Sequence, residues 1–214
     1  MSDSWPWLTL ALLGAYHGLN PAMGWLFAVA LGLQEQRRGA VLQALPPIAL
    51  GHAMAVLIAV LVIGVAEIVV PLDVVRYVCA GVLIIFGLYK FVRRRHPRWV
   101  GMRVGFGDLT AWSFLMASAH GAGLMLIPVL LRLSSNEHVH GAHADHASMT
   151  GSATALADLG VIGIHTLAMF VVMAAVAILV YERLGVAILK RSWFNVDLLW
   201  AGALVGAGII TLVV

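Results

Sequence analysis

Apolar stretches long enough to cross a lipid bilayer follow one another along this chain. A helix needs about 20 apolar residues to cross roughly 30 Å of hydrocarbon. Six windows meet that length, at 5–33, 44–66, 73–92, 108–132, 157–181 and 195–214. Only 11% of the 214 residues are charged, against about 25% in soluble domains. Because unpaired backbone groups are costly in lipid, each window is expected to be helical. The sequence predicts an all-α membrane protein with six transmembrane helices.

The first window is long and carries Asn20-Pro21 near its middle. Proline removes a backbone donor and crowds the preceding turn, so we expect the first helix to be broken at this point. Pro46-Pro47 lies at the start of the second window. Proline is tolerated in the first turn of a helix, and we expect these two residues there.

Basic residues predict the orientation of the chain. Eleven of the thirteen lysines and arginines fall in the three segments 34–43, 90–107 and 182–194. Basic loops stay in the cytoplasm, so both termini and the loop 133–156 are expected outside. These features predict an integral protein of a bacterial-type inner membrane, with residues 93–107 as a basic cytoplasmic linker.

Elements of the first half recur in the second half. The recurring elements are His17 and His120, 103 residues apart, His52 and His165, 113 apart, and Ala80-Gly81 and Ala201-Gly202, 121 apart. Three spans separate each pair, so the second copy enters the membrane from the opposite side. We therefore expect two inverted three-helix repeats, residues 1–92 and 108–214, of the kind found in secondary transporters.

The four repeated histidines are the main candidates for a functional site. An ionisable side chain at membrane depth normally faces the interior or a watery cavity, and imidazole is a good ligand for nickel, cobalt, zinc and copper ions. His17, His52, His120 and His165 are therefore predicted to bind a metal ion as substrate, with Asn20 beside them. The alternative for each histidine is a structural hydrogen bond between helices.

A histidine-rich tract lies in the predicted outer loop 133–156. It contains His138, His140, His143 and His146 together with Glu137 and Asp145. Such tracts bind metal ions, and we expect this one to collect cations at the outer face without forming the transport site. A loop without any metal-related role remains the alternative.

Three aspartates and several glycines have structural interpretations. Asp108, Asp158 and Asp197 lie near the predicted helix starts, where a carboxylate complements the helix dipole. The glycines beside the first and third of the repeated histidines allow close helix contacts. These are Gly14, Gly18, Gly24, Gly121 and Gly123.

Several motifs together resemble the lysine-exporter (LysE-type) superfamily of small six-helix transporters. They are Gly18-Leu19-Asn20-Pro21, Leu31-Gly32-Leu33, Arg37-Arg38-Gly39-Ala40, Ala49-Leu50-Gly51-His52 and residues 80–90. The histidines of the first two spans and the histidine-rich loop are most similar to the nickel/cobalt-efflux (NicO-type) branch. In that branch acidic residues and a second histidine follow the first histidine, whereas Leu19-Asn20-Pro21 follows His17 here. The resemblance implies a metal exporter.

These observations favour a secondary transporter that exports a divalent or soft transition-metal cation. The chain has no GxxxxGK[ST] motif, so ion or proton gradients are the expected energy source. The runner-up is an amino-acid or small-metabolite exporter, and a haem-binding membrane redox protein is a further alternative. No enzymatic activity, tightly bound cofactor or nucleic-acid partner is expected. The expected partners are the transported ion or small molecule, the lipid bilayer and a second copy of the chain in a homodimer.

Overall fold

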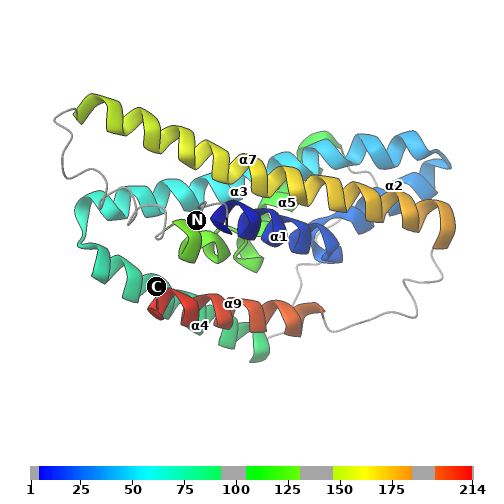
Figure 1. Cartoon of the computed structure of the whole chain (residues 1–214). Helices are drawn as coiled ribbons and strands as arrows, with labels where there is room; N and C mark the ends of the chain where they lie inside the picture. Colours follow the sequence, from blue (N-terminus) through cyan, green and yellow to red (C-terminus); the bar gives the residue numbers. More distant parts are fainter. Residues whose placement is uncertain (1–4, 93–104, 131–146, 185–195, 214) are drawn as a thin grey trace.

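The computed structural model describes residues 5–92, 105–130, 147–184 and 196–213, and all regular structure within these ranges is helical (Figure 1). This confirms the all-α prediction for the described part of the chain. The helices are α1 (Trp5–Leu19), α2 (Trp25–Glu35), α3 (Arg38–Val69), α4 (Leu72–Val92), α5 (Phe106–His120), α7 (Ala147–Leu179) and α9 (Val196–Val213), with short turns η1 (Pro21–Met23), η2 (Leu124–Leu126) and η3 (Val180–Leu184).

Three of the described helices are long and apolar enough to cross a membrane, in α3, α4 and α7. A fourth candidate consists of α5 and the segment Leu124–Leu130, which are bent by 50° relative to each other. The described part of the chain thus has three or four candidate membrane spans, as expected of an integral membrane protein.

The predicted break in the first helix is present. Helix α1 ends at Leu19, and the Asn20 Oδ1 atom accepts a hydrogen bond of 3.0 Å from the backbone N of Ala22. Pro21 then begins the 3₁₀ turn η1. Gly24 follows with φ +122°, a conformation that side chains rarely adopt. The break is therefore built from an asparagine cap, a proline and a glycine in sequence.

A second break follows α5. Gly121 lies in the left-handed region with φ +70°, and its backbone N donates to the Ser118 carbonyl at 3.0 Å. The next backbone N, of Ala122, donates to the Ala117 carbonyl at 2.9 Å. These two bonds end the helix in a glycine-based cap. Each broken segment therefore carries one of the repeated histidines in the last turn of its first helix, His17 in α1 and His120 in α5.

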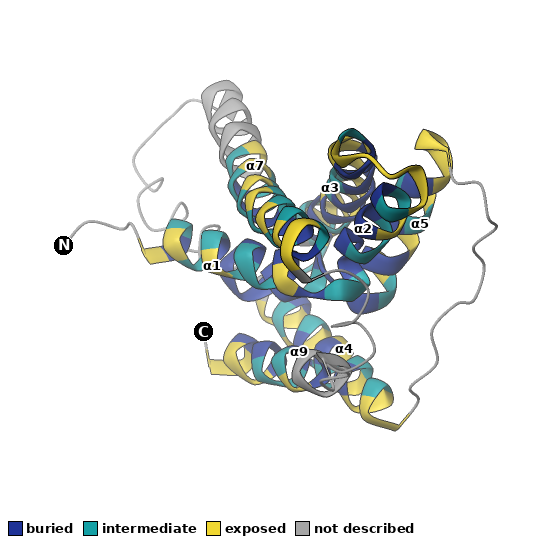
Figure 2. Ribbon diagram, turned by 90° about the vertical axis from the view of Figure 1, so that its right-hand side faces the viewer, coloured by how far each residue is buried: buried dark blue, intermediate teal, exposed yellow. Residues whose placement is uncertain are grey.

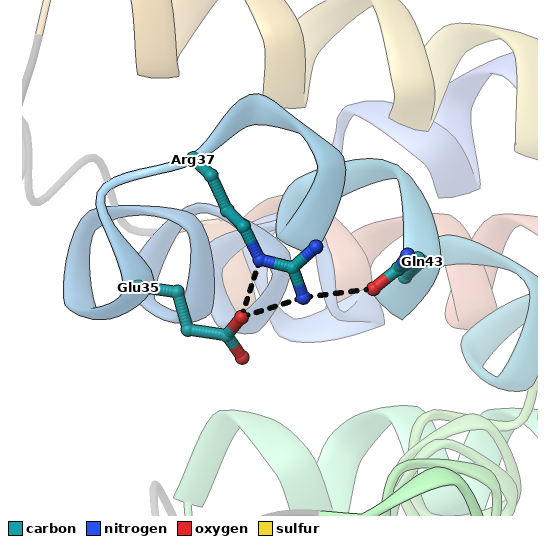
Figure 3. Close-up of polar contacts among 3 residues, drawn as sticks. All are labelled: Glu35, Arg37 and Gln43. Atoms are coloured by element: carbon teal, nitrogen blue, oxygen red, sulfur yellow. Dashed lines mark hydrogen bonds and ion pairs between the residues drawn. The ribbon is translucent and has the colours of Figure 1, made fainter.

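The expected position of Pro46-Pro47 is wrong. Helix α3 begins at Arg38, so the two prolines lie inside the helix rather than in its first turn. The helix thus extends by the six residues Arg38–Gln43 before the predicted window 44–66. Ahead of the helix, Arg37 donates to Glu35 at 2.7 Å and to Gln43 at 3.1 Å (Figure 3). This exposed network holds the tight connection between α2 and α3.

The predicted loop 133–156 is too long, because α7 begins at Ala147. Residues 147–156 are helical, and Asp158 lies within α7 rather than at its start. Asp108 does cap α5, where its Oδ2 atom accepts a hydrogen bond of 2.9 Å from the Gly105 backbone. Residues 93–104 of the linker and residues 131–146 of the loop lie outside the described residues.

The helices associate in three main pairs, α1 with α7, α3 with α5 and α4 with α9. Figure 1 shows α7 running along α1 and α2, while α4 and α9 lie side by side below the other helices. Figure 2 shows the same arrangement from the side, with buried residues facing the neighbouring helices. Each pair joins a helix of the first half of the chain to a helix of the second half.

Glycines set the close approach in the pairs α1–α7 and α3–α5. A Cβ atom on Gly14 would lie 2.2 Å from the His165 carbonyl oxygen, and one on Gly18 would lie 2.5 Å from the Met169 carbonyl oxygen. A Cβ atom on Gly51 of α3 would lie 2.2 Å from the Thr110 carbonyl oxygen of α5. The order of these contacts shows that α1 and α7 run in the same direction. The packing interpretation of Gly14 and Gly18 is confirmed.

The contact between α3 and α5 also runs in one direction. Ser113 of α5 donates through Oγ to the Ile48 carbonyl at 2.6 Å. Farther along, a Cβ atom on Gly123 would lie 2.2 Å from the Ala59 Cβ atom. Residue numbers therefore rise together along the two segments, as they do for α1 and α7.

The pair α4–α9 is antiparallel and reciprocal. A Cβ atom on Gly87 would lie 2.7 Å from Val205 and 3.0 Å from the Ala201 carbonyl oxygen. A Cβ atom on Gly208 would lie 2.7 Å from Ile84 and 3.1 Å from the carbonyl oxygen of Ala80. Each residue of the first contact has its counterpart 121 positions away in the second.

An arginine closes one end of this pair. The Arg76 Nε atom donates to the Thr211 carbonyl at 2.9 Å, and Nη2 donates to the Leu212 carbonyl. These carbonyls belong to the last turn of α9, where a cation is favourable because the helix dipole is negative. Arg76 therefore fixes the register of α9 along α4.

We predict that Gly87→Val lowers the free energy of unfolding by about 1 to 3 kcal/mol, because the new side chain overlaps Val205 and the Ala201 backbone. The matched control is Gly81→Val in the same helix, where an added Cβ atom would meet nothing within 4 Å. Thermal unfolding in detergent measures the difference. Equal destabilisation by both substitutions would contradict the close packing of α4 on α9.

Candidate functional site

The four repeated histidines are all buried within the described bundle. His17 and His165 are 0% exposed, His52 is 1% exposed and His120 is 2% exposed. Along α7, His165 lies one turn from Val161 and one turn from Met169, which belong to two different apolar clusters. Along α3, His52 lies in the same way between Ile48 and Val56. His52 and His165 thus lie at the boundary between two apolar clusters.

Three of the histidines meet. The ring of His17 lies 4.8 Å from that of His165 and 5.3 Å from that of His52, measured between centroids, and both contacts are edge-on. The rings of His52 and His165 are stacked, 5.4 Å apart and inclined by 17°. We call these three residues the histidine triad. His120, the fourth, is buried at the end of α5.

Backbone carbonyls determine which nitrogen carries the proton in three of the four rings. The Nδ1 atom of His17 lies 2.8 Å from the Leu13 carbonyl oxygen, and that of His120 lies 2.8 Å from the Met116 carbonyl oxygen. The Nδ1 atom of His165 lies 3.3 Å from the carbonyl oxygen of Leu10. A carbonyl only accepts, so Nδ1 must carry the hydrogen. In the neutral ring the lone pair is then on Nε2.

These carbonyl groups are the part of the site that sequence reasoning missed. For His17 and His120 the signal was available, because a side chain in a helix can reach the carbonyl four residues earlier. The bond from His165 to Leu10 joins two helices that are far apart in sequence. The close approach at Gly14 that permits this bond becomes visible only in the structure.

Several buried polar atoms near the breaks and in the triad have no hydrogen-bond partner among the described residues. They are both ring nitrogens of His52, Nε2 of His165 and Nδ2 of Asn20. Each such atom costs about 1 to 3 kcal/mol unless a ligand or water satisfies it. Asn20 uses its oxygen to accept from Ala22, so its remaining group is a donor, which suits an oxygen-containing ligand or a bare imidazole nitrogen.

The spacing of the triad suits a metal ion, although the ring orientations do not yet converge. Two imidazoles that bind one tetrahedral ion at about 2.0–2.1 Å have ring centres about 5 Å apart, close to the separations seen here. In the described residues, no three His, Cys, Asp or Glu side chains form a metal-holding group as they stand. The His52 ring stacks on His165 and has no hydrogen-bond partner among the described residues, so it is the ring that can turn toward a shared ion without breaking a bond to a carbonyl.

The ends of two helices add a favourable field for a cation. His17 lies in the last turn of α1 and His120 is the last residue of α5. The carboxyl end of a helix carries about half a negative charge, and transporters with discontinuous helices use such ends to bind cations. The two breaks therefore place histidines where a positive charge is stabilised.

Methionine sulfur binds soft metal ions, so the methionines of these helices are also of interest. Met23, Met116, Met125, Met169 and Met173 are buried, and Met54 is 43% exposed. The buried methionines that belong to the apolar clusters are Met23, Met125, Met169 and Met173, in agreement with a packing role. The loop histidines His138, His140, His143 and His146 lie outside the described residues.

Comparison of the chain with protein-family models, with curated proteins and with solved structures finds no match. Function must therefore be argued from the site itself.

We predict that His52→Leu raises the free energy of unfolding in the absence of metal by about 1 kcal/mol, because it replaces a buried ring whose nitrogens find no hydrogen-bond partner in the described part of the chain. The matched control is His165→Leu, which loses the bond to the Leu10 carbonyl and should not gain stability. Thermal unfolding in detergent with a chelator compares the two proteins. Strong destabilisation by His52→Leu would mean that this ring has a structural partner.

Proposed function

We propose that the protein is a secondary transporter that exports a divalent or soft transition-metal cation through the histidine triad. The observation that carries this proposal is the orientation of the imidazoles by backbone carbonyls. Histidines that bind metal almost always donate their other ring nitrogen to a carbonyl, a carboxylate or water, which leaves the ligand nitrogen ready to bind. Three imidazoles with a water molecule as the fourth ligand would form zinc-like coordination, and nickel, cobalt and copper ions also accept imidazole.

The alternative of an amino-acid exporter fits the buried polar groups less well. An amino acid brings an ammonium and a carboxylate, and both need charged or strongly polar partners in a dry site. The buried polar side chains of the described residues are histidine, asparagine, serine and threonine, without an acidic or basic partner among them. Neutral imidazoles and helix carboxyl ends match a cation better than a zwitterion.

A haem-binding protein is the other alternative, and the ring contacts favour transport over it. A haem held by two axial histidines would lie between their rings. Here the rings of His52 and His165 stack on each other, and His17 contacts both. A Soret band in the purified protein would overturn this argument.

We further propose six transmembrane segments arranged as two inverted repeats, residues 1–92 and 108–214. The directions of the helix pairs support this: α1 and α7 run together, α3 and α5 run together, and α4 and α9 are antiparallel. When successive spans alternate in direction, the first and fifth spans (α1 and α7) run in the same direction, and so do the second and fourth (α3 and α5). The third and sixth spans (α4 and α9) then run in opposite directions. The reciprocal contact between α4 and α9 adds a pseudo-two-fold axis perpendicular to both helices.

The inverted-repeat arrangement agrees both with the expected energy source and with the family resemblance of the sequence. Inverted repeats with broken helices are typical of secondary transporters driven by ion or proton gradients. The likeness of the sequence motifs to the LysE-type superfamily, and to its NicO-type branch, agrees with export of a metal ion. A bacterial-type inner membrane with both termini outside is the corresponding proposed location.

Metal binding tests the proposal directly. Protein purified without a His-tag is expected to bind one of Ni²⁺, Co²⁺, Zn²⁺ or Cu⁺ stoichiometrically, because all four ions accept imidazole ligands. His165→Asn should weaken binding by more than about 100-fold, since even the loss of an outer partner costs 10–100-fold. His96→Asn, in the linker, is the control. Absence of binding by the parent protein refutes the proposal.

Labelling tests the orientation. In a Cys79→Ser background, His140→Cys should react with a membrane-impermeant maleimide added to intact cells, and Arg94→Cys should react only after the membrane is opened. Leu204→Cys, at a site that is 0% exposed, is the unreactive control. The reverse pattern for residues 140 and 94 would show that the chain is inserted with the opposite orientation.

A further inference from the structure

We infer that the four histidines form two overlapping three-ligand sites rather than one four-ligand site. Both sites share His52 and His165, and they are completed by His17 in one conformation and by His120 in the other. The ion then passes between the sites as the protein changes conformation. This inference rests on the proposed function and adds to it a separate role for His120.

The first argument is that the pseudo-two-fold axis, which relates the two halves of the chain, also relates the four histidines to one another. Exchanging the two halves moves His17 onto His120, 103 residues later, and interchanges His52 with His165, 113 residues apart. The triad His17, His52 and His165 therefore becomes a second triad in which His120 replaces His17. The two shared rings are stacked 5.4 Å apart and nearly parallel, an arrangement that a two-fold axis passing between them allows.

The second argument is that the equivalence extends to hydrogen bonds. His17 donates to the Leu13 carbonyl at 2.8 Å, and His120 donates to the Met116 carbonyl at 2.8 Å. Leu13 and Met116 are themselves 103 residues apart. The two exchangeable histidines are thus held in the same way on equivalent helices, with the lone pair on Nε2 in each.

The third argument is that one hydrogen bond, made by His165 in the second half of the chain, has no equivalent at His52 in the first half. His165 donates to the Leu10 carbonyl of α1 at 3.3 Å. The equivalent bond would run from His52 to the carbonyl of Ser113, which lies 103 residues after Leu10. Instead, both nitrogens of His52 are unpartnered among the described residues, and the Ser113 hydroxyl donates to the Ile48 carbonyl at 2.6 Å.

This difference marks the structure as one of two related conformations. Here α1 and α7 are engaged through His165, and His17 contacts the shared pair. In the opposite conformation His52 would donate to the Ser113 carbonyl, His165 would be released, and His120 would join the pair. The ion would keep two imidazoles throughout and exchange one, so it would never have to lose its whole ligand shell inside the membrane.

Asparagine substitutions separate the two sites. Asparagine reaches about as far as Nδ1, so it retains a donor toward the carbonyl and removes the Nε2 ligand. The variants are His17→Asn, His120→Asn, the double variant and His52→Asn. Each is checked for folding by gel filtration and thermal unfolding. Binding is then measured by calorimetry and transport in proteoliposomes, both with the ion among Ni²⁺, Co²⁺, Zn²⁺ and Cu⁺ that the parent protein binds most tightly.

Each single variant at the exchangeable positions retains one complete triad. His17→Asn and His120→Asn should therefore keep measurable binding and lose transport, while the double variant should bind at least about tenfold more weakly than either one. His52→Asn breaks both triads and should weaken binding by more than about 100-fold alone. His96→Asn is the control for both assays.

Two outcomes would overturn the inference. Loss of binding by all three single changes to the same extent, including His52→Asn, would mean one four-ligand site. Transport by His120→Asn at the parental rate would mean one fixed triad without a second site. The parent protein is measured first, and if it binds none of the four ions, the proposed function fails and the inference falls with it.

Discussion

The close approach of α1 to α7 is the constraint on which the site depends. No side chain fits at Gly14, where a Cβ atom would lie 2.2 Å from the His165 carbonyl oxygen. In lipid there is little hydrophobic drive between helices, so such backbone contact is a main source of association. It places His165 within 3.3 Å of the Leu10 carbonyl and brings its ring to His17. A larger residue at position 14 would separate the helices and take the triad apart.

The triad lowers stability in the absence of a ligand. His52 has no hydrogen-bond partner among the described residues and is packed between apolar clusters. Buried polar groups in membrane proteins are rare and mark functional sites because an apolar residue would be more stable there. A ligand that satisfies these nitrogens recovers the cost. The cost of burying these nitrogens without partners is therefore an argument for ligand binding, and it does not depend on likeness to any known protein.

The sequence predicted the helical class, the break at Asn20-Pro21 and the small residues that pack, because each follows from local chemistry. It misplaced the starts of α3 and α7, since a hydropathy window cannot detect helix that continues beyond the hydrocarbon. The repeat spacing identified the four histidines but could not rank them. Which rings touch depends on helix rotation and on contacts between residues more than 100 positions apart, and a single sequence does not encode these in any local pattern.

Symmetry is retained where helices only pack and is lost where the proposed ion would bind. The contacts of Gly87 and Gly208 in the α4–α9 pair correspond residue by residue. The bonds around His52 and His165 do not correspond, because only His165 reaches a carbonyl on the neighbouring helix. A fold with two equivalent arrangements must adopt one of them at a time, since interfaces switch between discrete states. The inequivalence of two related histidines is therefore what an alternating transporter should display in any one of its conformations.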